Sequence, residues 1–567
     1  MSSGTPDLRA GARPARRSVV EVYDTTLRDG TQREGLSLSC DDKLRIAERL
    51  DAFGVAYIEA GWPGSNPKDA EMFERARDMQ WSHAEIAAFG STRRAKLAVE
   101  DDPQLATLLA AGTSVCTIFG KTWTMQVTEV LRTTLDENLR MIEESVAYLR
   151  AQGRHVIYDA EHFFDGYKAD AAYAMEAIRA AARGGAATLS LCDTNGGSMP
   201  WEVDAIVREV RAALDADEQT RDVELGAHVH NDGECAVANS LAALRAGARH
   251  VQGTINGYGE RCGNANLCSI VADAELKLGL SCLPEGKLAE LYDLSHFVAE
   301  VANLQADDHA AYVGRSAFAH KGGTHVAAIR RHPAAYQHID PAQVGNQCRI
   351  VVSELSGRGN VLSKAEELGL DVTAEQGAHL LEMIKRAEAA GFAYEAAEAS
   401  VALLMAREDP DYAPPFDVID FQASVGRRRG GEMFSEATVK VRVGGEVVHT
   451  AGDGNGPVSA LDQALRKALR ATFPRIDEIH LADYKVRILD GGNGTSATTR
   501  VLIDSASGQD AWSTVGASSN IIEASLQALV DGIEYGLSLF DGGGRPATAP
   551  PRLSHEDPTA RDAERAR

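Results

Sequence analysis

The chain has 567 residues, of which 44% are hydrophobic and 25% are charged, as is ordinary for a globular protein. No apolar run approaches the roughly 20 residues that cross a bilayer, so no membrane-spanning role is expected. With 58 Lys and Arg against 82 Asp and Glu, the net charge of −24 would repel a phosphate backbone and argues against a nucleic-acid partner.

The ends of the chain and the cysteines indicate a cytoplasmic protein. The basic N-terminal segment lacks the apolar stretch of a secretory signal, and we expect 1–17 and 542–567 to be disordered tails. The eight cysteines form no CxxC pairs and have no regular spacing, which disfavours both a zinc finger and a disulfide framework. A reducing cytoplasm is therefore the expected location.

Residues 18–285 alternate short β-branched runs with helical stretches, a rhythm that predicts parallel strands joined by helices. The eight expected strands span 19–24, 55–60, 84–89, 114–119, 155–160, 187–192, 223–229 and 249–255. Their number and spacing predict a (β/α)8 TIM barrel, with an open doubly wound sheet as the alternative. The helix after the first strand is expected to begin with a capping box from Ser39 to Asp42.

Beyond the barrel the sequence changes character twice. Residues 286–408 lose the strand rhythm, and their Ala- and Leu-rich segments predict helical linker subdomains. A proline-rich run at 409–415 marks a boundary, because proline removes helix donors and stiffens linkers. Residues 409–541 then combine strands with helices near 457–472 and 518–538, which predicts an α+β domain. The glycine-rich GDGNG and GGNG segments of this domain do not continue into GK[ST], so turns are favoured over nucleotide sites.

Two strand ends and one loop predict a divalent-metal site. Arg28 and Asp29 follow the first strand, at the end of the barrel where active sites lie. Alone, such a pair is more often a surface ion pair. His228 and His230, however, are two residues apart on a strand and point to the same face. Asn264, in a glycine-rich segment after the eighth strand, can add a neutral oxygen. The set of Asp29, His228, His230 and Asn264 fits Mg²⁺ or Mn²⁺ and leaves Zn²⁺ open.

Three well-separated motifs resemble one family of enzymes. DTTLRDGTQREG (24–35), HVHND (228–232) and GYGERCGNAN (257–266) are together similar to the 2-isopropylmalate, homocitrate and citramalate synthases. The resemblance runs from about residue 19 to about residue 541. Four more segments look most like the citramalate synthases that use pyruvate: GWPGSNPKD (61–69), DAEHFFDGYK (159–168), CDTNGG (192–197) and YQHIDPAQVGN (336–346).

The resemblance implies an acyltransferase that condenses acetyl-CoA with pyruvate to (R)-citramalate, in isoleucine biosynthesis. We expect Arg28 to face the oxygen that becomes an alkoxide, because negative charge then develops beside a positive one. The resemblance points to Glu161 as a group that orients the substrate or relays a proton. It points to His325 in HKGGTH as the base, a residue that the partner subunit could supply. Gln32 and Thr194 are expected to bind the substrate.

Two features weaken parts of this assignment. The loop that carries His325 also holds His320, His332 and His338, so simple solvation of this polar loop is the alternative to the favoured catalytic role. After VGN, the segment 347–349 reads Gln-Cys-Arg where similar sequences tend to carry two arginines, so no substrate or CoA contact is assigned to that loop.

The resemblance also implies a homodimer whose C-terminal unit is a regulatory and dimerisation domain. Its allosteric effector would be a branched-chain amino acid, and isoleucine is expected for a pyruvate enzyme. Three alternatives remain: a 2-isopropylmalate synthase acting on 2-oxoisovalerate in leucine biosynthesis, a lyase that cleaves an acyl-CoA, and an inactive amino-acid sensor. The long C-terminal domain argues against the lyase, and the complete ligand set argues against the sensor.

Overall fold

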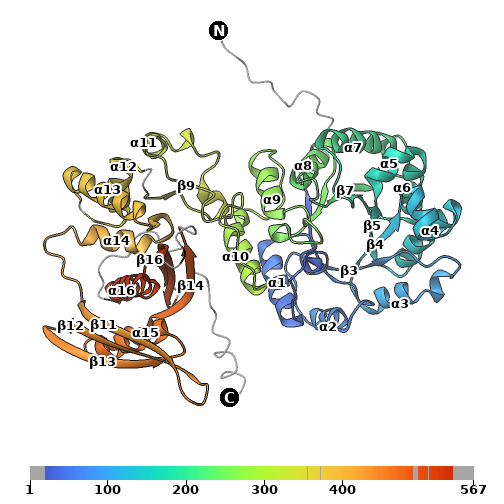
Figure 1. Cartoon of the computed structure of the whole chain (residues 1–567). Coiled ribbons are helices and arrows are strands. Elements are labelled where there is room, and N and C mark those ends of the chain that lie inside the picture. Colours follow the sequence, from blue (N-terminus) through green and yellow to red (C-terminus); the bar gives the residue numbers. More distant parts are fainter. Residues whose placement is uncertain are drawn as a thin grey trace, which may run out of the picture. The chain divides into compact units, whose positions relative to one another are not determined.

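The computed structural model of the chain describes residues 19–353, 356–370, 372–489, 494, 496–508 and 510–540. The expected tails, and most of the GGNG segment, lie outside these residues. The chain forms two compact units (Figure 1). Among the described residues, the barrel unit extends to Phe318 and includes Ile339–Gln347, and the C-terminal unit comprises Ala319–His338 and the residues from Cys348 onward. The structure thus divides into two compact units. Our proposed division of the sequence has three parts, at 18–285, 286–408 and 409–541.

The barrel unit contains a closed barrel of eight parallel strands in sequential order. They are β1 (Glu21–Asp24), β2 (Tyr57–Gly61), β3 (Glu85–Ser91), β4 (Val115–Lys121), β5 (His155–Glu161), β6 (Thr188–Asp193), β7 (Glu224–Val229) and β8 (His250–Gly253). Pairing of Tyr23 with Gln252 between β1 and β8 closes the ring. The predicted (β/α)8 fold is confirmed, and the open-sheet alternative is wrong.

Helices surround these strands, as Figure 1 shows. They are α1 (Cys40–Phe53), α2 (Pro67–Ala76), α3 (Pro103–Ala110), α4 (Leu135–Ala151), α5 (Phe163–Ala169), α6 (Ala171–Gly184), α7 (Pro200–Asp215), α8 (Ala236–Ala246), α9 (Leu267–Leu276) and α10 (Leu291–Val301). Short turns add η1 (Gly30–Gln32), η2 (Val99–Asp101), the π-helical η3 (Gln126–Val130), η4 (Ile255–Gly257), η5 (Lys287–Glu290) and η7 (Pro341–Val344).

Local signals set where these helices begin. The capping box of α1 is present, with Asp42 N donating to Ser39 Oγ at 3.1 Å and Ser39 N to Asp42 Oδ2 at 2.9 Å. Leu44, Ala47 and Leu50 of α1 are buried in the barrel core. The apolar face of α1 therefore packs inward.

The C-terminal unit has helices followed by two three-stranded antiparallel sheets. The first part holds β9 (Ala319–His320), α11 (Gly323–Arg331), η6 (Pro333–Ala335), β10 (Arg349–Ile350), α12 (Arg358–Glu367), α13 (Ala374–Ala389), η8 (Tyr394–Ala396) and α14 (Glu398–Ala406). The sheets and their helices are β11 (Phe416–Arg427), β12 (Met433–Val443), β13 (Glu446–Gly454), α15 (Pro457–Leu469), η9 (Pro474–Glu478), β14 (His480–Ile488), β15 (Thr499–Ser507), β16 (Asp510–Ser518) and α16 (Ile521–Phe540).

Helices pack against both sheets. α15 packs against β12 and β13, and α16 packs against β15 and β16. Together they enclose a shared apolar core that includes Val439, Leu465, Ile503 and Leu529. The predicted α+β character of this region is confirmed. In the described ranges no helix is both long and apolar enough to cross a membrane.

Candidate metal centre and active site

Asp29, His228 and His230 form a buried cluster that could hold a metal ion. Asp29 follows β1, His228 is on β7, and His230 lies just beyond β7. The Nε2 atoms of His228 and His230 are 3.3 Å and 3.8 Å from Asp29 Oδ2. The two Nε2 atoms are 3.3 Å apart. Both imidazoles therefore present the same ring atom to one carboxylate oxygen, the convergence that their spacing on a strand predicted.

Asn264 joins this cluster from the loop after β8. Its Nδ2 donates to Asp29 Oδ2 at 2.6 Å, and it forms an isolated β-bridge with His230. Its Oδ1 is buried and accepts no hydrogen bond from any described residue. A buried acceptor without a donor is costly, so this oxygen is suited to a cation. Gly259 has no side chain, and a Cβ atom at that position would collide with Asn264 Oδ1.

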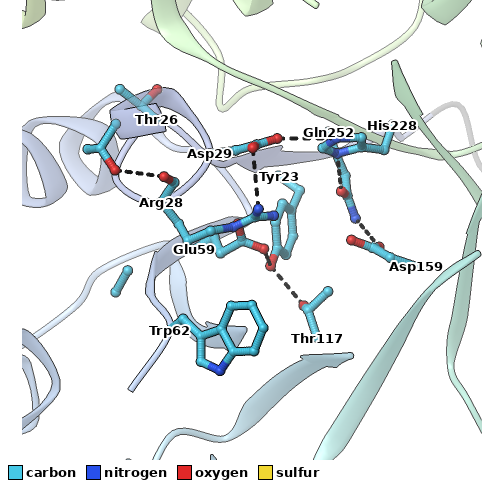
Figure 2. A network of polar contacts seen from close by, with 12 residues as sticks. Tyr23, Thr26, Arg28, Asp29, Glu59, Trp62, Thr117, Asp159, His228 and Gln252 are labelled. Atoms are coloured by element: carbon cyan, nitrogen blue, oxygen red, sulfur yellow. Dashed lines mark hydrogen bonds and ion pairs between the residues drawn. The ribbon is translucent and has the colours of Figure 1, made fainter. Parts of the chain in front are cut away.

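A second layer of side chains orients His228. Gln252 Nε2 donates to Asp159 Oδ1 at 2.8 Å, which turns Gln252 Oε1 toward His228 Nδ1, also at 2.8 Å (Figure 2). Because that amide oxygen can only accept, Nδ1 carries a proton, and Nε2 is the ring atom that faces Asp29. Burial raises the pKa of Asp159 to about 6.

Arg28 is fixed beside the cluster by two carboxylates. Its Nε donates to Glu59 Oε1 at 2.5 Å, its Nη1 is 3.3 Å from Asp29 Oδ1, and its Cζ lies 3.6 Å from the centroid of the Phe89 ring. Glu59 is fully buried and also accepts from the Tyr23 hydroxyl at 2.7 Å. The side chains of Arg28 and Asp29 are only 12% and 4% exposed, so this pair is not a surface ion pair.

The charges of the site follow from these contacts. Burial by itself would raise the pKa of Asp29, but the Arg28 charge and the His228 hydrogen bond outweigh it and hold the pKa far below its usual range. Burial lowers the pKa of His230 to about 4, and the neighbouring His228 adds to that effect. Near neutral pH Asp29 is therefore ionised and the His230 imidazole is neutral, as metal ligands must be. Burial by itself would lower the pKa of His228, but the hydrogen bond and charge of Asp29 raise it, so this imidazole must release a proton when a metal ion binds.

The other predicted site residues occupy different positions. Glu161 ends β5 and forms an ion pair with Lys121, which ends β4. The Thr194 hydroxyl accepts from the backbone N–H of His162 at 2.9 Å, which leaves its own hydrogen for another acceptor. Gln32 ends η1 and is exposed. Since β5 and β6 run parallel to β1 and β7, Glu161 and Thr194 lie at the same end of the barrel as Asp29.

His325 belongs to the C-terminal unit. It lies on α11, and its ring stacks on Tyr336 with centroids 4.1 Å apart. Its role as a base stays a prediction.

Four contributing residues had no role assigned from the sequence: Tyr23, Glu59, Asp159 and Gln252. Each lies within a strand, with its side chain buried. Their polar character within apolar strands could have marked them as functional candidates. The sequence does not show, however, which side chains they contact.

Comparisons with known proteins cover nearly all the described chain. Residues 19–298 match the family described as HMGL-like, 312–391 the homocitrate synthase post-HMGL domain-like family, and 395–537 the LeuA allosteric (dimerisation) domain. The chain is 53% identical over 523 residues to the (R)-citramalate synthase of Geobacter sulfurreducens, covering 92% of this chain and 98% of that one. It is 54% identical over 529 residues to the (R)-citramalate synthase of Synechocystis, covering 92% and 97%. Identity to the 2-isopropylmalate synthase of Methanocaldococcus jannaschii is 29% over 523 residues, covering 91% and 94%.

Proposed function

Because the chain belongs to the family of (R)-citramalate synthases, we propose that it joins the acetyl group of acetyl-CoA to pyruvate and releases (R)-citramalate and CoA. The observation that carries this proposal is identity above 50% over nine-tenths of the chain to two such enzymes. The 2-isopropylmalate synthase alternative has weaker support, at 29% identity. The buried group of Asp29, His228 and His230 beside Arg28 argues against an inactive sensor.

The residues present fit a divalent cation. Asp29, His228, His230 and Asn264 would hold it, and the unpartnered Oδ1 of Asn264 together with the convergent Nε2 atoms supports this assignment. Two oxygen donors with two imidazoles suit Mg²⁺ or Mn²⁺, with Zn²⁺ as a third candidate. When bound, such an ion acts as a Lewis acid on the ketone of the 2-oxo acid.

Arg28 supplies the second positive charge. Burial by itself would lower the pKa of Arg28, but Glu59 and Asp29 raise it above its usual value, so the guanidinium stays charged. It donates to the ketone oxygen of pyruvate, on which negative charge grows as the carbon–carbon bond forms. Glu59 and Phe89 fix the guanidinium beforehand, so little reorganisation is needed during the reaction.

The nucleophile requires removal of a proton from the methyl group of the thioester. We assign this step to a ring nitrogen of His325, with the Glu161 carboxylate as a substrate-orienting or proton-relaying group. The Thr194 hydroxyl donates to the carboxylate of pyruvate, and Gln32 adds a polar contact. Water then hydrolyses the citramalyl-CoA thioester, which releases CoA and makes the reaction effectively irreversible.

We also propose a cytoplasmic homodimer that serves isoleucine biosynthesis and is inhibited by isoleucine. The match of 395–537 to an allosteric dimerisation domain supports this assembly. Ile419 and Val425 on β11, and Val486 and Ile488 on β14, are exposed apolar side chains that a second copy would cover. All eight cysteines are free in the described part of the chain, as expected in a reducing compartment.

The test is release of free CoA thiol from acetyl-CoA with Mg²⁺ or Mn²⁺, comparing pyruvate, 2-oxoisovalerate and 2-oxoglutarate at equal concentrations. Preference for pyruvate supports citramalate synthesis. Preference for 2-oxoisovalerate would be compatible with the same fold and metal site but would assign the protein to leucine biosynthesis. Release with none of the three would refute the proposal.

A further inference from the structure

Three aromatic side chains form a wall next to Arg28. Trp62 contacts Phe89 and Phe119 edge-on, with centroids 5.6 Å and 5.9 Å away and interplanar angles of 80° and 79°. Phe89 and Phe119 stack on each other at 5.5 Å, and the face of Phe89 carries the Arg28 guanidinium. Phe89 and Phe119 are on β3 and β4, and Trp62 directly follows β2. Figure 2 shows the Trp62 ring beside Arg28 and Glu59.

A buried ion pair holds Trp62 in this position. Asp69 on α2 accepts the backbone N–H of Trp62 on Oδ2 at 2.9 Å, and the ammonium of Lys43 on α1 lies 2.5 Å from Oδ1. Lys43 and Asp69 are 4% and 5% exposed. A Cβ atom on Gly61 would lie 2.6 Å from the Asp69 carboxyl carbon, so glycine is needed for this close approach.

Stability by itself does not explain why the Lys43–Asp69 ion pair is buried. Both charges of the Lys43–Asp69 pair are removed from water, and a buried ion pair of this kind is often no more stable than apolar side chains of similar volume. The pair does fix a position, because it links α1 and α2 to the backbone of Ala60 and Trp62. The aromatic rings have few rotamers and pack on one another, so the wall is stiff.

We propose that Trp62 determines which 2-oxo acids the enzyme accepts, and that Lys43 and Asp69 are positioning residues that act through it. The inference rests on the proposed condensation. When Arg28 contacts the ketone oxygen, the substituent on the ketone carbon lies only two bonds from that oxygen, and therefore beside the aromatic wall that adjoins Arg28. A methyl group fits beside the wall, whereas a longer or branched substituent collides with it.

The first experiment measures kcat/KM of the full-length Trp62→Ala and Trp62→Leu variants with pyruvate, 2-oxobutanoate and 2-oxoisovalerate. We expect the ratio of kcat/KM for 2-oxobutanoate to that for pyruvate to rise about tenfold, a change typical of one methylene in an apolar pocket. Trp201→Ala is the matched control, because Trp201 is 71% exposed on α7. A ratio that stays constant while both substrates lose rate equally overturns the inference.

The second experiment tests the ion pair with Lys43→Met/Asp69→Leu, or with Asp69→Asn if the double variant does not fold. We expect the same ratio to shift in the same direction as in the Trp62 variants. Lys364→Met/Glu367→Leu removes the ion pair between another buried lysine and a partly buried carboxylate, in the C-terminal unit, and should lower Tm without changing the ratio. If Lys43 and Asp69 are only structural, both double variants will lower Tm and neither will move the ratio.

The outcomes separate the two proposals. A wild-type enzyme that releases no thiol with pyruvate refutes the proposed function itself. A wild-type enzyme that prefers pyruvate, combined with unchanged ratios in the variants, refutes only the roles of Trp62, Lys43 and Asp69.

Discussion

His228 Nδ1 donates to Oε1 of Gln252 at 2.8 Å, and this bond turns His228 Nε2 toward Asp29. Gln252 is itself oriented by Asp159, which accepts its amide at 2.8 Å. The orientation of one candidate ligand therefore depends on residues of two other strands. Outer partners of this kind fix the tautomer and the direction of a metal-binding imidazole.

Gln252→Ala should weaken metal binding about 10- to 100-fold, because His228 loses the partner that fixes its tautomer. Calorimetric titration of the metal-free protein with Mn²⁺ measures this loss. Ser190→Ala is a suitable control, since the Ser190 hydroxyl is buried and neither donates nor accepts a hydrogen bond within the described residues. Equal Mn²⁺ affinity in the two variants would contradict the role of Gln252.

Arg28→Ala should lower kcat about 100- to 1000-fold, because a preorganised donor to the developing alkoxide is lost. Binding of Mn²⁺ should survive, since Arg28 is not among the four candidate ligands. Thiol release and Mn²⁺ titration on the same preparation separate the two effects. Unchanged turnover would show that Arg28 does not stabilise the alkoxide.

His325→Ala should lower kcat about 100-fold or more, as expected when a general base is removed. His332→Ala provides the control, because His332 is exposed and lies just beyond the same helix. Steady-state thiol release, measured for both variants, shows whether the loss of turnover is specific to His325. Near-normal turnover of His325→Ala would mean that this loop is only solvated.

Asp51 should contribute to the pH dependence of stability. Its carboxylate accepts the backbone N–H groups of Ser82, His83 and Ala84 at 2.9, 2.8 and 2.7 Å. Burial would raise its pKa, but these three bonds outweigh that effect and lower the pKa below its usual value.

The direction of the effect follows from the lowered pKa. The stabilisation is fully present above the unfolded-state pKa of about 3.9 and is lost as the pH falls through the folded-state pKa below it. Asp51→Asn should therefore unfold at a lower urea concentration than wild type at pH 7, with the difference shrinking toward pH 2.5. A constant difference across this range would contradict the assignment.

Val486→Asp/Ile488→Asp should weaken the proposed dimer, because two charges would replace exposed apolar side chains of β14. Light scattering after gel filtration measures the mass of the variant and of wild type.

The same samples test the effector, and isoleucine should inhibit thiol release by the wild-type protein. Absence of inhibition by isoleucine, leucine and valine would remove the allosteric claim.

How much of the site could be predicted depended on the sequence distance between partners. Arg28 and Asp29 are adjacent, and His228 and His230 share one strand, so motif and periodicity were sufficient to group them. Glu59 lies 31 residues from Arg28, and Gln252 lies 24 residues from His228. Those contacts depend on the register between strands, which no local pattern contains.

Taken by itself, the sequence determined the eight strands, the beginning of α1, and the residues that converge as candidate metal ligands. These features follow from short-range rules of periodicity, capping and placement at strand ends. Only the tertiary structure decided that Glu59 fixes Arg28, that Gln252 orients His228, and that Lys43 and Asp69 hold Trp62 against Phe89. Each of these contacts joins side chains of different elements, and closure of the barrel is what brings those elements together.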